Sequence, residues 1–394
     1  MEAEKEGWWK RVAKERLGIL GGTFNPVHSG HISMAKAAMK AAKLDRVLML
    51  PDGVPPHKTG IASAEDRWRM LCAAVAQEPG LEPCRLELDR GGVTYTVDTL
   101  TGLHSSLPKA ELYYIIGADT LMELHNWRFF ERVLALCTFL VVPRVCDHTP
   151  GEIDAERRRL TGLGGKFISV DMPPVGVSSR EVREAIRQDL PTPLLPVPVR
   201  EYAQLMGLYG CEPRIIESEV WMGPLFNDLS RKRFAHTLAV ASTARSLALI
   251  HHVDAHKAEV AALLHDCAKC LPLAEMQRVA RRGGRYVEPE LLESDNLLHS
   301  VAGAALAKDK YGVSDPAVLD AIASHTTGHA DMSPLAMVVY LADKIEPTRQ
   351  SYPTLDKVRM LASLSLERAM LASVEGTAAH VESKGKGRLH PRTL

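Results

Sequence analysis

The chain has 394 residues, which is long enough for two or more domains, and 46% of them are hydrophobic. Lysine plus arginine and aspartate plus glutamate number 48 each, so the formal net charge is zero. This balance gives no whole-chain attraction to nucleic acid or to a membrane, so any phosphate site must be built locally. No apolar run reaches the roughly 18 residues of a membrane span. Seven scattered cysteines without a secretory signal predict reduced thiols in a cytoplasmic protein, with a homo-oligomer left open.

The first motif is a glycine-rich loop between a predicted strand and a predicted helix. Residues 17–20 are an apolar run typical of a buried strand, and residues 32–43 have helical periodicity. Between them lies GGTFNPVHSGH, whose two adjacent glycines let the backbone turn tightly and approach a ligand. The helix amino terminus offers free N–H groups to an anion, and His28 and His31 flank it. Neither a dinucleotide fingerprint nor a Walker loop is present, and a plain turn with two surface histidines is the structural alternative.

The rest of the first half alternates strand and helix patterns. Further strands are predicted at 45–50, 84–89, 111–117, 139–142 and 167–170. Helices are predicted at 64–77 and from the segment 91–100 onwards. Such alternation indicates an α/β fold with a doubly wound parallel sheet. Ligands of these sheets bind at the carboxyl ends of the strands, which is where the polar clusters of this half fall.

Six motifs, in order, make this half similar to a known family. They are GGTFNPVHSGH, VPPHK, GGVTYTVDTL, YYIIGADTLMELHNW, VSSREVR and VPVREYAQLMGLY. Residues 17–209 therefore resemble bacterial nicotinate-nucleotide adenylyltransferase, a Rossmann-like member of the HxGH nucleotidylyltransferase superfamily that joins ATP to nicotinate mononucleotide. That family usually has ISSTxIR at the fifth motif, and here Arg180 replaces the threonine.

The resemblance implies a role for each matched residue. His28 and His31 would hold the ATP phosphates together with Mg²⁺. The other implied catalytic residues are Lys58 and Arg183, with Arg183 on the leaving phosphates. The implied substrate-binding residues are Gly21, Gly22, Thr23, Phe24, His57, Thr94, Tyr95, Gly117, Asp119, Trp127, Arg144, Ser178 and Ser179. Trp127 would stack on the pyridine ring, although its spacing alone fits a core aromatic equally well. Adenylyl transfer to phosphopantetheine or to the amidated mononucleotide is the alternative that the HxGH loop does not separate.

Strand patterns nearly vanish after residue 210. Helical periodicity recurs at 234–252, 256–264, 302–310, 317–325, 335–345 and 355–375, which indicates an all-α domain. We predict an adenylyltransferase domain over 1–210, a linker over 211–216, a helical domain over 217–375 and a mobile basic tail over 376–394.

Six residues of metal-ligand type fall on the inward faces of these predicted helices. They are His236, His265, Asp266, His299, His325 and Asp343. A lone histidine on an apolar face is usually a core residue, but burying so many polar groups unpaired is unfavourable. A metal would satisfy them together. The pair Cys267 and Cys270 has no second CxxC beside it, and we interpret it as structural.

The finer pattern RxxHT, LLHDxAK, LLH, SHTTG and LADKIEPTR resembles the HD phosphohydrolase superfamily, in particular bacterial hydrolases that split diadenosine tetraphosphate symmetrically. The resemblance implies one metal on His236, His265, Asp266 and Asp343. Asp266 would bridge to a second metal on His299 and His325. Such ligands suit iron or manganese. The catalytic residues implied here are Asp266 and Lys269, with Lys269 holding a substrate phosphate. Two alternatives stay open for this half, a non-catalytic metal-stabilised nucleotide sensor and an oligomerisation module that regulates the first domain.

Overall fold

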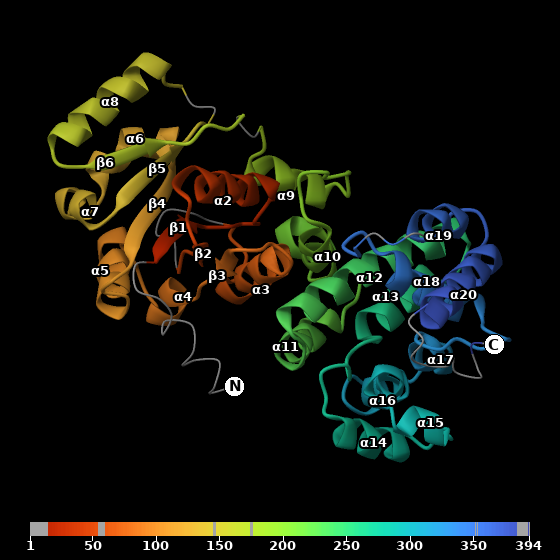
Figure 1. The fold of residues 1–394 in the computed structure, drawn as a ribbon. Helices are drawn as coiled ribbons and strands as arrows, with labels where there is room; N and C mark the ends of the chain where they lie inside the picture. The colour runs from red at the N-terminus through yellow and green to blue at the C-terminus, as the bar shows by residue number, and fades with distance from the viewer. Residues whose placement is uncertain are drawn as a thin grey trace. The chain divides into compact units, whose positions relative to one another are not determined.

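The computed structural model describes residues 15–53, 60–144, 147–173, 176–350, 352, 354–383 and 393. The chain divides into two compact units, residues 1–199 and 200–394. The first contains the strands and the second is helical throughout its described part (Figure 1). No helix within these described ranges combines the length and apolar character that crossing a membrane requires.

The first unit is built on a parallel sheet of six strands in the described residues. They are β1 (Arg16–Gly22), β2 (Arg46–Pro51), β3 (Leu81–Pro83), β4 (Glu111–Gly117), β5 (Thr138–Val142) and β6 (Lys166–Ser169). Their order is β3-β2-β1-β4-β5-β6, and every neighbouring pair is parallel. The chain therefore winds outward in both directions from β1, which confirms the predicted doubly wound α/β fold.

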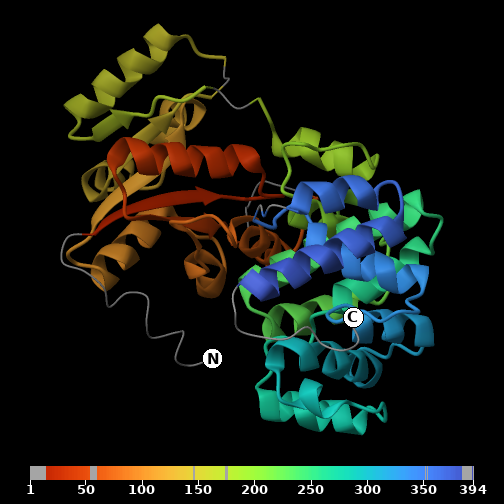
Figure 2. The same cartoon turned by 45° about the vertical axis from the view of Figure 1, so that its right-hand side comes forward.

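Helices cover both faces of this sheet. They are α2 (Ser29–Ala42), α3 (Ala64–Val75), α4 (Leu86–Arg90), α5 (Thr96–Ser106), α6 (Ala118–Glu123), α7 (Phe130–Leu136), α8 (Pro150–Gly162) and α9 (Ser179–Arg187). Leu17 and Ile19 of β1 are fully buried in a cluster with Leu100 of α5 and Val133 of α7. The helix α2 lies on the opposite face (Figure 2). Burial on both faces explains why the central strands are continuous apolar runs.

The strand predicted at 84–89 is wrong. The structure has the short strand β3 before it, and Leu86–Arg90 form α4. The alternation of apolar and charged residues there fits a strand, but Arg85 and Asp89 are an i,i+4 ion pair at 3.0 Å, which favours a helical turn. The buried Glu87 of α4 then accepts a hydrogen bond from Thr99 of α5 at 2.7 Å.

The second unit is an array of helices. They are α10 (Val197–Leu205, which begins in the first unit), α11 (Ser218–Asp228), α12 (Arg231–Ile250), α13 (Ala255–Leu264), α14 (Leu273–Arg282), α15 (Pro289–Leu292), α16 (Asp295–Asp309), α17 (Pro316–Ser324), α18 (Pro334–Ile345), α19 (Leu355–Ala362) and α20 (Leu366–Ser383). Side-chain caps start many of them, as Ser230 does for α12 and Asp315 for α17. This arrangement confirms the predicted helical domain.

Two details differ from the expected pattern. The single helix predicted over 355–375 is wrong, because Ser365 accepts a hydrogen bond from the N–H of Arg368 at 3.3 Å and begins a new helix, α20. That helix runs to Ser383, so residues 376–383, counted above with the tail, are helical.

The helix α10 packs with the helical unit. The ring of Tyr202 lies 6.3 Å from that of Phe234, and Glu201 pairs with Arg214 at 2.7 Å. The compact units therefore divide within α10, upstream of the limit expected at residue 210. The boundary between the compact units thus differs from the boundary that the sequence motifs indicate. The domain limits expected from the sequence stay a prediction.

Candidate functional site

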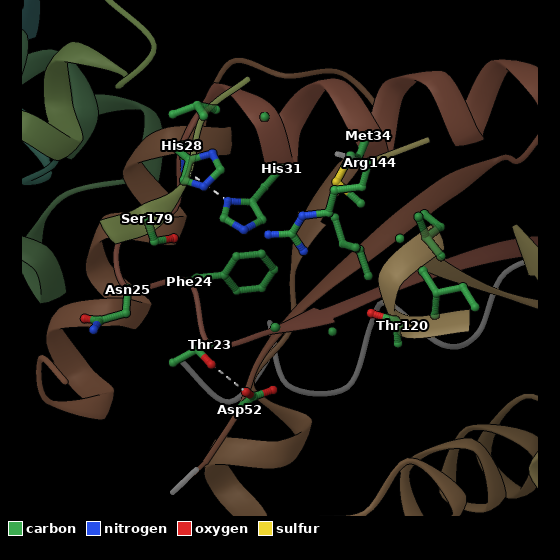
Figure 3. A pocket seen from close by; sticks show the side chains of 18 of the residues that line it. Thr23, Phe24, Asn25, His28, His31, Met34, Asp52, Thr120, Arg144 and Ser179 are labelled. Atoms are coloured by element: carbon green, nitrogen blue, oxygen red, sulfur yellow. Dashed lines mark hydrogen bonds between the residues drawn. The ribbon is translucent and has the colours of Figure 1, made fainter. Parts of the chain in front are cut away.

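The first unit contains a pocket of about 670 Å³ at the carboxyl ends of β1, β4 and β5. Figure 3 shows that residues from the glycine-rich loop, from α2 and from α9 converge there. The predicted site residues that line it are Gly21, Gly22, Thr23, Phe24, His28, His31, Gly117, Trp127, Arg144, Ser179 and Arg183. The loop containing His57 and Lys58 lies outside the described residues.

The two histidines are linked through the first turn of α2. His28 is the N-cap, and its backbone N–H donates to Nδ1 of His31 at 3.2 Å. Because Nδ1 of His31 accepts, the ring of neutral His31 carries its proton on Nε2. The ring centroids of His28 and His31 lie 3.8 Å apart, and the ring of Phe24 packs edge-on to His31 at 5.0 Å. This packing holds the two imidazoles in place before a ligand binds.

Both histidines are neutral at neutral pH. Burial, with the nearby Arg144, lowers the pKa of His28 to about 4. Burial, with His28 and Arg144 next in effect, holds the pKa of His31 well below its ordinary value of 6.5. The imidazoles can therefore act as hydrogen-bonding groups, and permanent positive charge must come from arginines.

Arginines reach the pocket from two elements. Nη1 of Arg183 donates to the carbonyl of Asn25 at 2.8 Å, and Oγ of Ser179 lies 3.4 Å from the carbonyl of Pro26. These contacts attach α9 to the glycine-rich loop. Arg144, which follows β5, pairs with Asp119 at 3.1 Å while half of its side chain stays exposed. The guanidinium groups can thus meet an anion arriving from solvent.

Four predicted substrate residues lie outside the pocket lining. Ser178 caps α9, and Asp119 is engaged by Arg144. Thr94 donates to Glu87 at 3.1 Å, and Tyr95 lies under the guanidinium of Arg128 at 4.5 Å. Their role at the substrate stays a prediction.

Trp127 does line the pocket. Its ring meets that of Tyr114 edge-on at 5.7 Å, so the indole packs against the sheet. This position is compatible with ring stacking on a substrate as well as with core packing.

Arg67 is a structural support of the pocket that the sequence analysis missed. Its side chain is 1% exposed and donates to the carbonyls of Thr23 at 2.9 Å, Asp52 at 2.8 Å and Gly53 at 2.8 Å. It thereby ties the loop after β1 to the loop after β2. An arginine within a helical segment is usually exposed, so no signal in the sequence marks this residue.

The second unit brings the six predicted metal ligands together. His236 lies on α12, His299 on α16 and Asp343 on α18. His265 and His325 are the C-cap residues of α13 and α17. Asp266 directly follows His265 in the sequence. All six are at most 7% exposed.

Asp266 stands between two groups of potential ligands. One group is His236, His265 and Asp266, and the other is Asp266, His299 and His325. Its Oδ2 lies 3.3 Å from Nε2 of His265, whereas its Oδ1 lies 3.2 Å from Nε2 of His299. Each carboxylate oxygen thus faces a different group, as a bridging ligand requires. Asp343 adds its Oδ1 to the first group, 3.0 Å from Nε2 of His236.

Hydrogen bonds on the far side of the rings orient these histidines. Nδ1 of His265 donates to the carbonyl of Ala262 at 2.6 Å, and Nδ1 of His325 to that of Ile322 at 2.8 Å. A carbonyl only accepts, so Nδ1 carries the proton and Nε2 presents a lone pair. Such outer bonds are typical of histidines that ligate metals.

His236 differs, because its Nδ1 faces the carboxylate of Glu346 at 3.1 Å. Glu346 is 1% exposed and also accepts from Oγ1 of Thr348 at 2.8 Å. The sequence analysis missed this carboxylate, although it lies only three residues after Asp343 in the motif LADKIEPTR.

The residues fit a divalent metal on physical grounds. Nε2 of His265 is buried without a hydrogen-bond partner, and a metal would satisfy it. Burial lowers the pKa of His325 to about 3, which keeps its ring neutral. Burial alone would raise the pKa of Asp266, but His265 and His299 hold it well below its ordinary value. Neutral imidazoles and ionised carboxylates are the forms that bind metals.

Several cations border this cluster. Arg233 pairs with Oδ2 of Asp266 at 2.6 Å, and both Arg349 and Lys344 pair with Asp343. Nζ of Lys269 lies 3.2 Å from Nδ1 of His299. A buried metal-ligand set with cations at its edge suits an anionic substrate such as a polyphosphate.

Comparisons with known proteins agree with both sites. The family model described as cytidylyltransferase-like matches residues 19–185, and the model described as HD domain matches residues 233–348. A Mycoplasma pneumoniae protein named "Probable nicotinate-nucleotide adenylyltransferase/Ap4A hydrolase" is 31% identical over 334 residues, covering 84% of this chain and 88% of that protein. A Mycoplasma genitalium protein of the same name is 28% identical over 368 residues, covering 92% and 97%.

A further relative matches the first unit by itself. This Corynebacterium kroppenstedtii protein, named "Probable nicotinate-nucleotide adenylyltransferase", is 38% identical over 209 residues, covering 52% of this chain and 96% of that protein. The two Mycoplasma proteins, by contrast, match across both units. The chain belongs to the family of these two-domain proteins, in which a cytidylyltransferase-like domain is followed by an HD domain.

Proposed function

We propose that this chain is a bifunctional enzyme. Its first unit transfers the adenylyl group of ATP to nicotinate mononucleotide, giving nicotinate adenine dinucleotide and pyrophosphate. Its second unit hydrolyses diadenosine tetraphosphate to two ADP. The observation that carries the proposal is the pairing, along one chain, of the imidazole and arginine pocket with the buried ligand cluster. The Mycoplasma pneumoniae relative, whose name contains both activities, matches across both units.

The first reaction needs positioning and charge stabilisation more than covalent chemistry. An oxygen of the mononucleotide phosphate attacks the α-phosphorus of ATP. The bond from that phosphorus to the oxygen that bridges the α- and β-phosphates breaks. Nε2–H of His31 donates to a phosphate oxygen, and Arg183 with Ser179 holds the β- and γ-phosphates. Trp127 stacks on the pyridine ring. Mg²⁺ accompanies ATP as a counter-ion.

The second reaction uses the buried cluster. His236, His265, Asp266 and Asp343 would hold one metal, and Asp266, His299 and His325 a second, with iron or manganese favoured by the ligand types. A bound divalent pair supplies Lewis acidity and lowers the pKa of water. Lys269 and Arg233 bind the phosphates of the substrate. The oxygen of one water attacks one of the two central phosphorus atoms, the bond from that phosphorus to the central bridging oxygen breaks, and two ADP result.

The test uses the purified full chain. Incubation with ATP, Mg²⁺ and nicotinate mononucleotide should give nicotinate adenine dinucleotide and pyrophosphate in equal amounts. Incubation with diadenosine tetraphosphate and manganese or ferrous iron should give ADP alone, and metal analysis should find about two metals per chain. ATP plus AMP as products would contradict the symmetric cleavage. Retained metal without hydrolysis of any nucleotide would favour the sensor, the alternative for the second unit.

A further inference from the structure

The residue Arg180 stands where the chain departs from the adenylyltransferase pattern. It is the second residue of α9, directly after Ser179. Residues on both sides of it contact the glycine-rich loop. Ser179 reaches the carbonyl of Pro26, and Arg183 that of Asn25. A methyl group added at Gly30 would lie 3.0 Å from the side chain of Val177. The start of α9 is therefore packed against the glycine-rich loop and the first turn of α2, which carry His28 and His31.

Arg180 lines the same pocket as His28, His31, Arg144 and Arg183. Within the described part of the chain its guanidinium forms no hydrogen bond or salt bridge, although it attracts Glu184 at longer range. The carboxylate of Glu184 is already paired with Arg187 at 2.6 Å. Packing and ion pairing thus leave the charge of Arg180 available.

The position is also unfavourable for a cation unless an anion is present. The first turn of a helix carries the positive end of the dipole, so acidic residues are preferred there and basic ones are disfavoured. Ser178 and Glu181 of the same turn obey this preference through a capping box. A polyphosphate in the pocket would make this position favourable for Arg180, since the helix amino terminus and the guanidinium would then both attract the same anion.

We propose that Arg180 is a further polyphosphate-binding residue of the adenylyl-transfer site, directed to the β- and γ-phosphates of ATP. The assignment to these phosphates follows from Ser179 and Arg183, which lie in the same helical turn and hold the same end of the nucleotide in the proposed function. A guanidinium can pair with two phosphate oxygens at once. When the bond between the α-phosphorus and its β-bridging oxygen breaks, Arg180 stays with the departing pyrophosphate.

This inference rests on the proposed adenylyl transfer and makes a quantitative distinction between ligands. Replacing Arg180 should weaken the ligands that contain the β- and γ-phosphates, namely ATP and pyrophosphate. It should leave nicotinate mononucleotide unaffected. A residue that merely stabilises α9 would change all three together, or none.

The experiment compares Arg180→Thr, which installs the residue usual in the family, and Arg180→Gln with the full-length wild-type chain. Arg158→Gln is the matched control, because Arg158 of α8 lies in the same unit, is exposed and does not line the pocket. Loss of one charge-assisted contact should raise the KM for ATP and the inhibition constant of pyrophosphate by about tenfold in both Arg180 variants. The KM for nicotinate mononucleotide should change less than about twofold. The affinity for pyrophosphate should also depend less steeply on salt.

Unchanged constants for ATP and pyrophosphate in both Arg180 variants would overturn the inference. So would equal losses for all three ligands. A wild-type chain that forms no dinucleotide would instead refute the proposed function. In that case, calorimetric titration with pyrophosphate alone still tests whether Arg180 binds phosphate. Equal affinity in wild type and Arg180→Thr would contradict the proposed contact, and weaker affinity in the variant would support it.

Discussion

The two candidate sites of this chain differ in how far their charged groups are exposed to solvent. In the first unit the charged groups remain in contact with solvent, as the side chains of Arg144 and Asp119 are 50% and 39% exposed. In the second unit the side chains of His265 and Asp266 are 0% and 3% exposed. Water can satisfy the first set until a nucleotide arrives. The second set is shielded from water, and the lone pair on Nε2 of His265 lacks a partner.

This difference determines how each site can be recognised. The geometry of the open pocket is compatible with many anions. Its ligand is therefore inferred from sequence motifs such as the HxGH loop. The buried cluster, by contrast, indicates a metal because it gathers several ligand-type side chains around Nε2 of His265, which is buried without a hydrogen-bond partner. Changes at the two sites should therefore separate cleanly, with loss of metal confined to the second.

The largest separation should come from Asp266→Asn, which removes the charge shared by both ligand groups. We expect loss of both metals and of diadenosine tetraphosphate hydrolysis, with nicotinate adenine dinucleotide formation unchanged. Elemental analysis and the two product assays measure this. Asp309→Asn, at the exposed end of α16, is the control. Full metal content in the Asp266 variant would show that the carboxylate is not a ligand.

The converse change is His31→Ala or His28→Ala. Removing one preorganised group that stabilises developing charge should raise the barrier to adenylyl transfer by about 2–4 kcal/mol, a loss of roughly 30-fold to 1,000-fold in kcat. Hydrolysis by the second unit should stay as in wild type. Steady-state kinetics measures both, with His125→Ala, an exposed histidine of the same unit, as the control. Near-normal kcat in both variants would contradict the assigned role.

A smaller effect within the second site should come from Glu346→Gln. The amide keeps the shape of Glu346 but removes the charge that faces Nδ1 of His236. Loss of such an outer carboxylate typically weakens metal affinity by about 10-fold to 100-fold. Competition with a chelator should show this loss for one of the two metals. Equal release from wild type and variant would make Glu346 a packing residue, and Glu293→Gln, exposed on the surface, controls for charge.

These residues also show what a sequence can and cannot reveal here. The parallel sheet and the six candidate ligands were predictable from the sequence. Apolar runs that alternate with helical patterns indicate the sheet, and the ligand-type residues lie in otherwise apolar helical segments. Arg67 and Glu346 were not. Arg67 acts through the carbonyl of Thr23, which is 44 residues away, and the role of Glu346 depends on His236, which is 110 residues away. Side-chain partners brought together only by folding leave no periodic pattern.

The same limit applies to the segment 84–89. Its alternation fits a strand, whereas the pairing of Arg85 with Asp89 and the hydrogen bond from Thr99 to Glu87 favour the helix that forms. The alternating pattern is outweighed there by one local ion pair and one contact with the neighbouring helix α5.

The smallest predicted effect concerns a buried charge cluster away from either site. Glu259 of α13 is 0% exposed, beside Glu201 of α10, and Arg214 pairs with both, at 2.9 Å and 2.7 Å. Arg245 of α12 lies 3.6 Å from Glu259. Burial, followed by repulsion from Glu201, raises the pKa of Glu259 to about 8 from its ordinary value of 4.5. The folded chain therefore holds a proton that the unfolded chain releases between these values.

Stability linked to a raised pKa is complete below the unfolded value and is lost as pH rises through the folded one. The contribution of Glu259 to the unfolding free energy should thus fall between pH 5 and pH 8. The unfolding free energy of wild type relative to that of Glu259→Gln should therefore fall by at least about 1 kcal/mol over this range, since one pKa unit corresponds to about 1.4 kcal/mol. Calorimetric unfolding at several pH values, compared with the exposed control Glu290→Gln, measures the difference. Parallel pH profiles for wild type and Glu259→Gln would mean that Arg214 and Arg245 keep both carboxylates ionised.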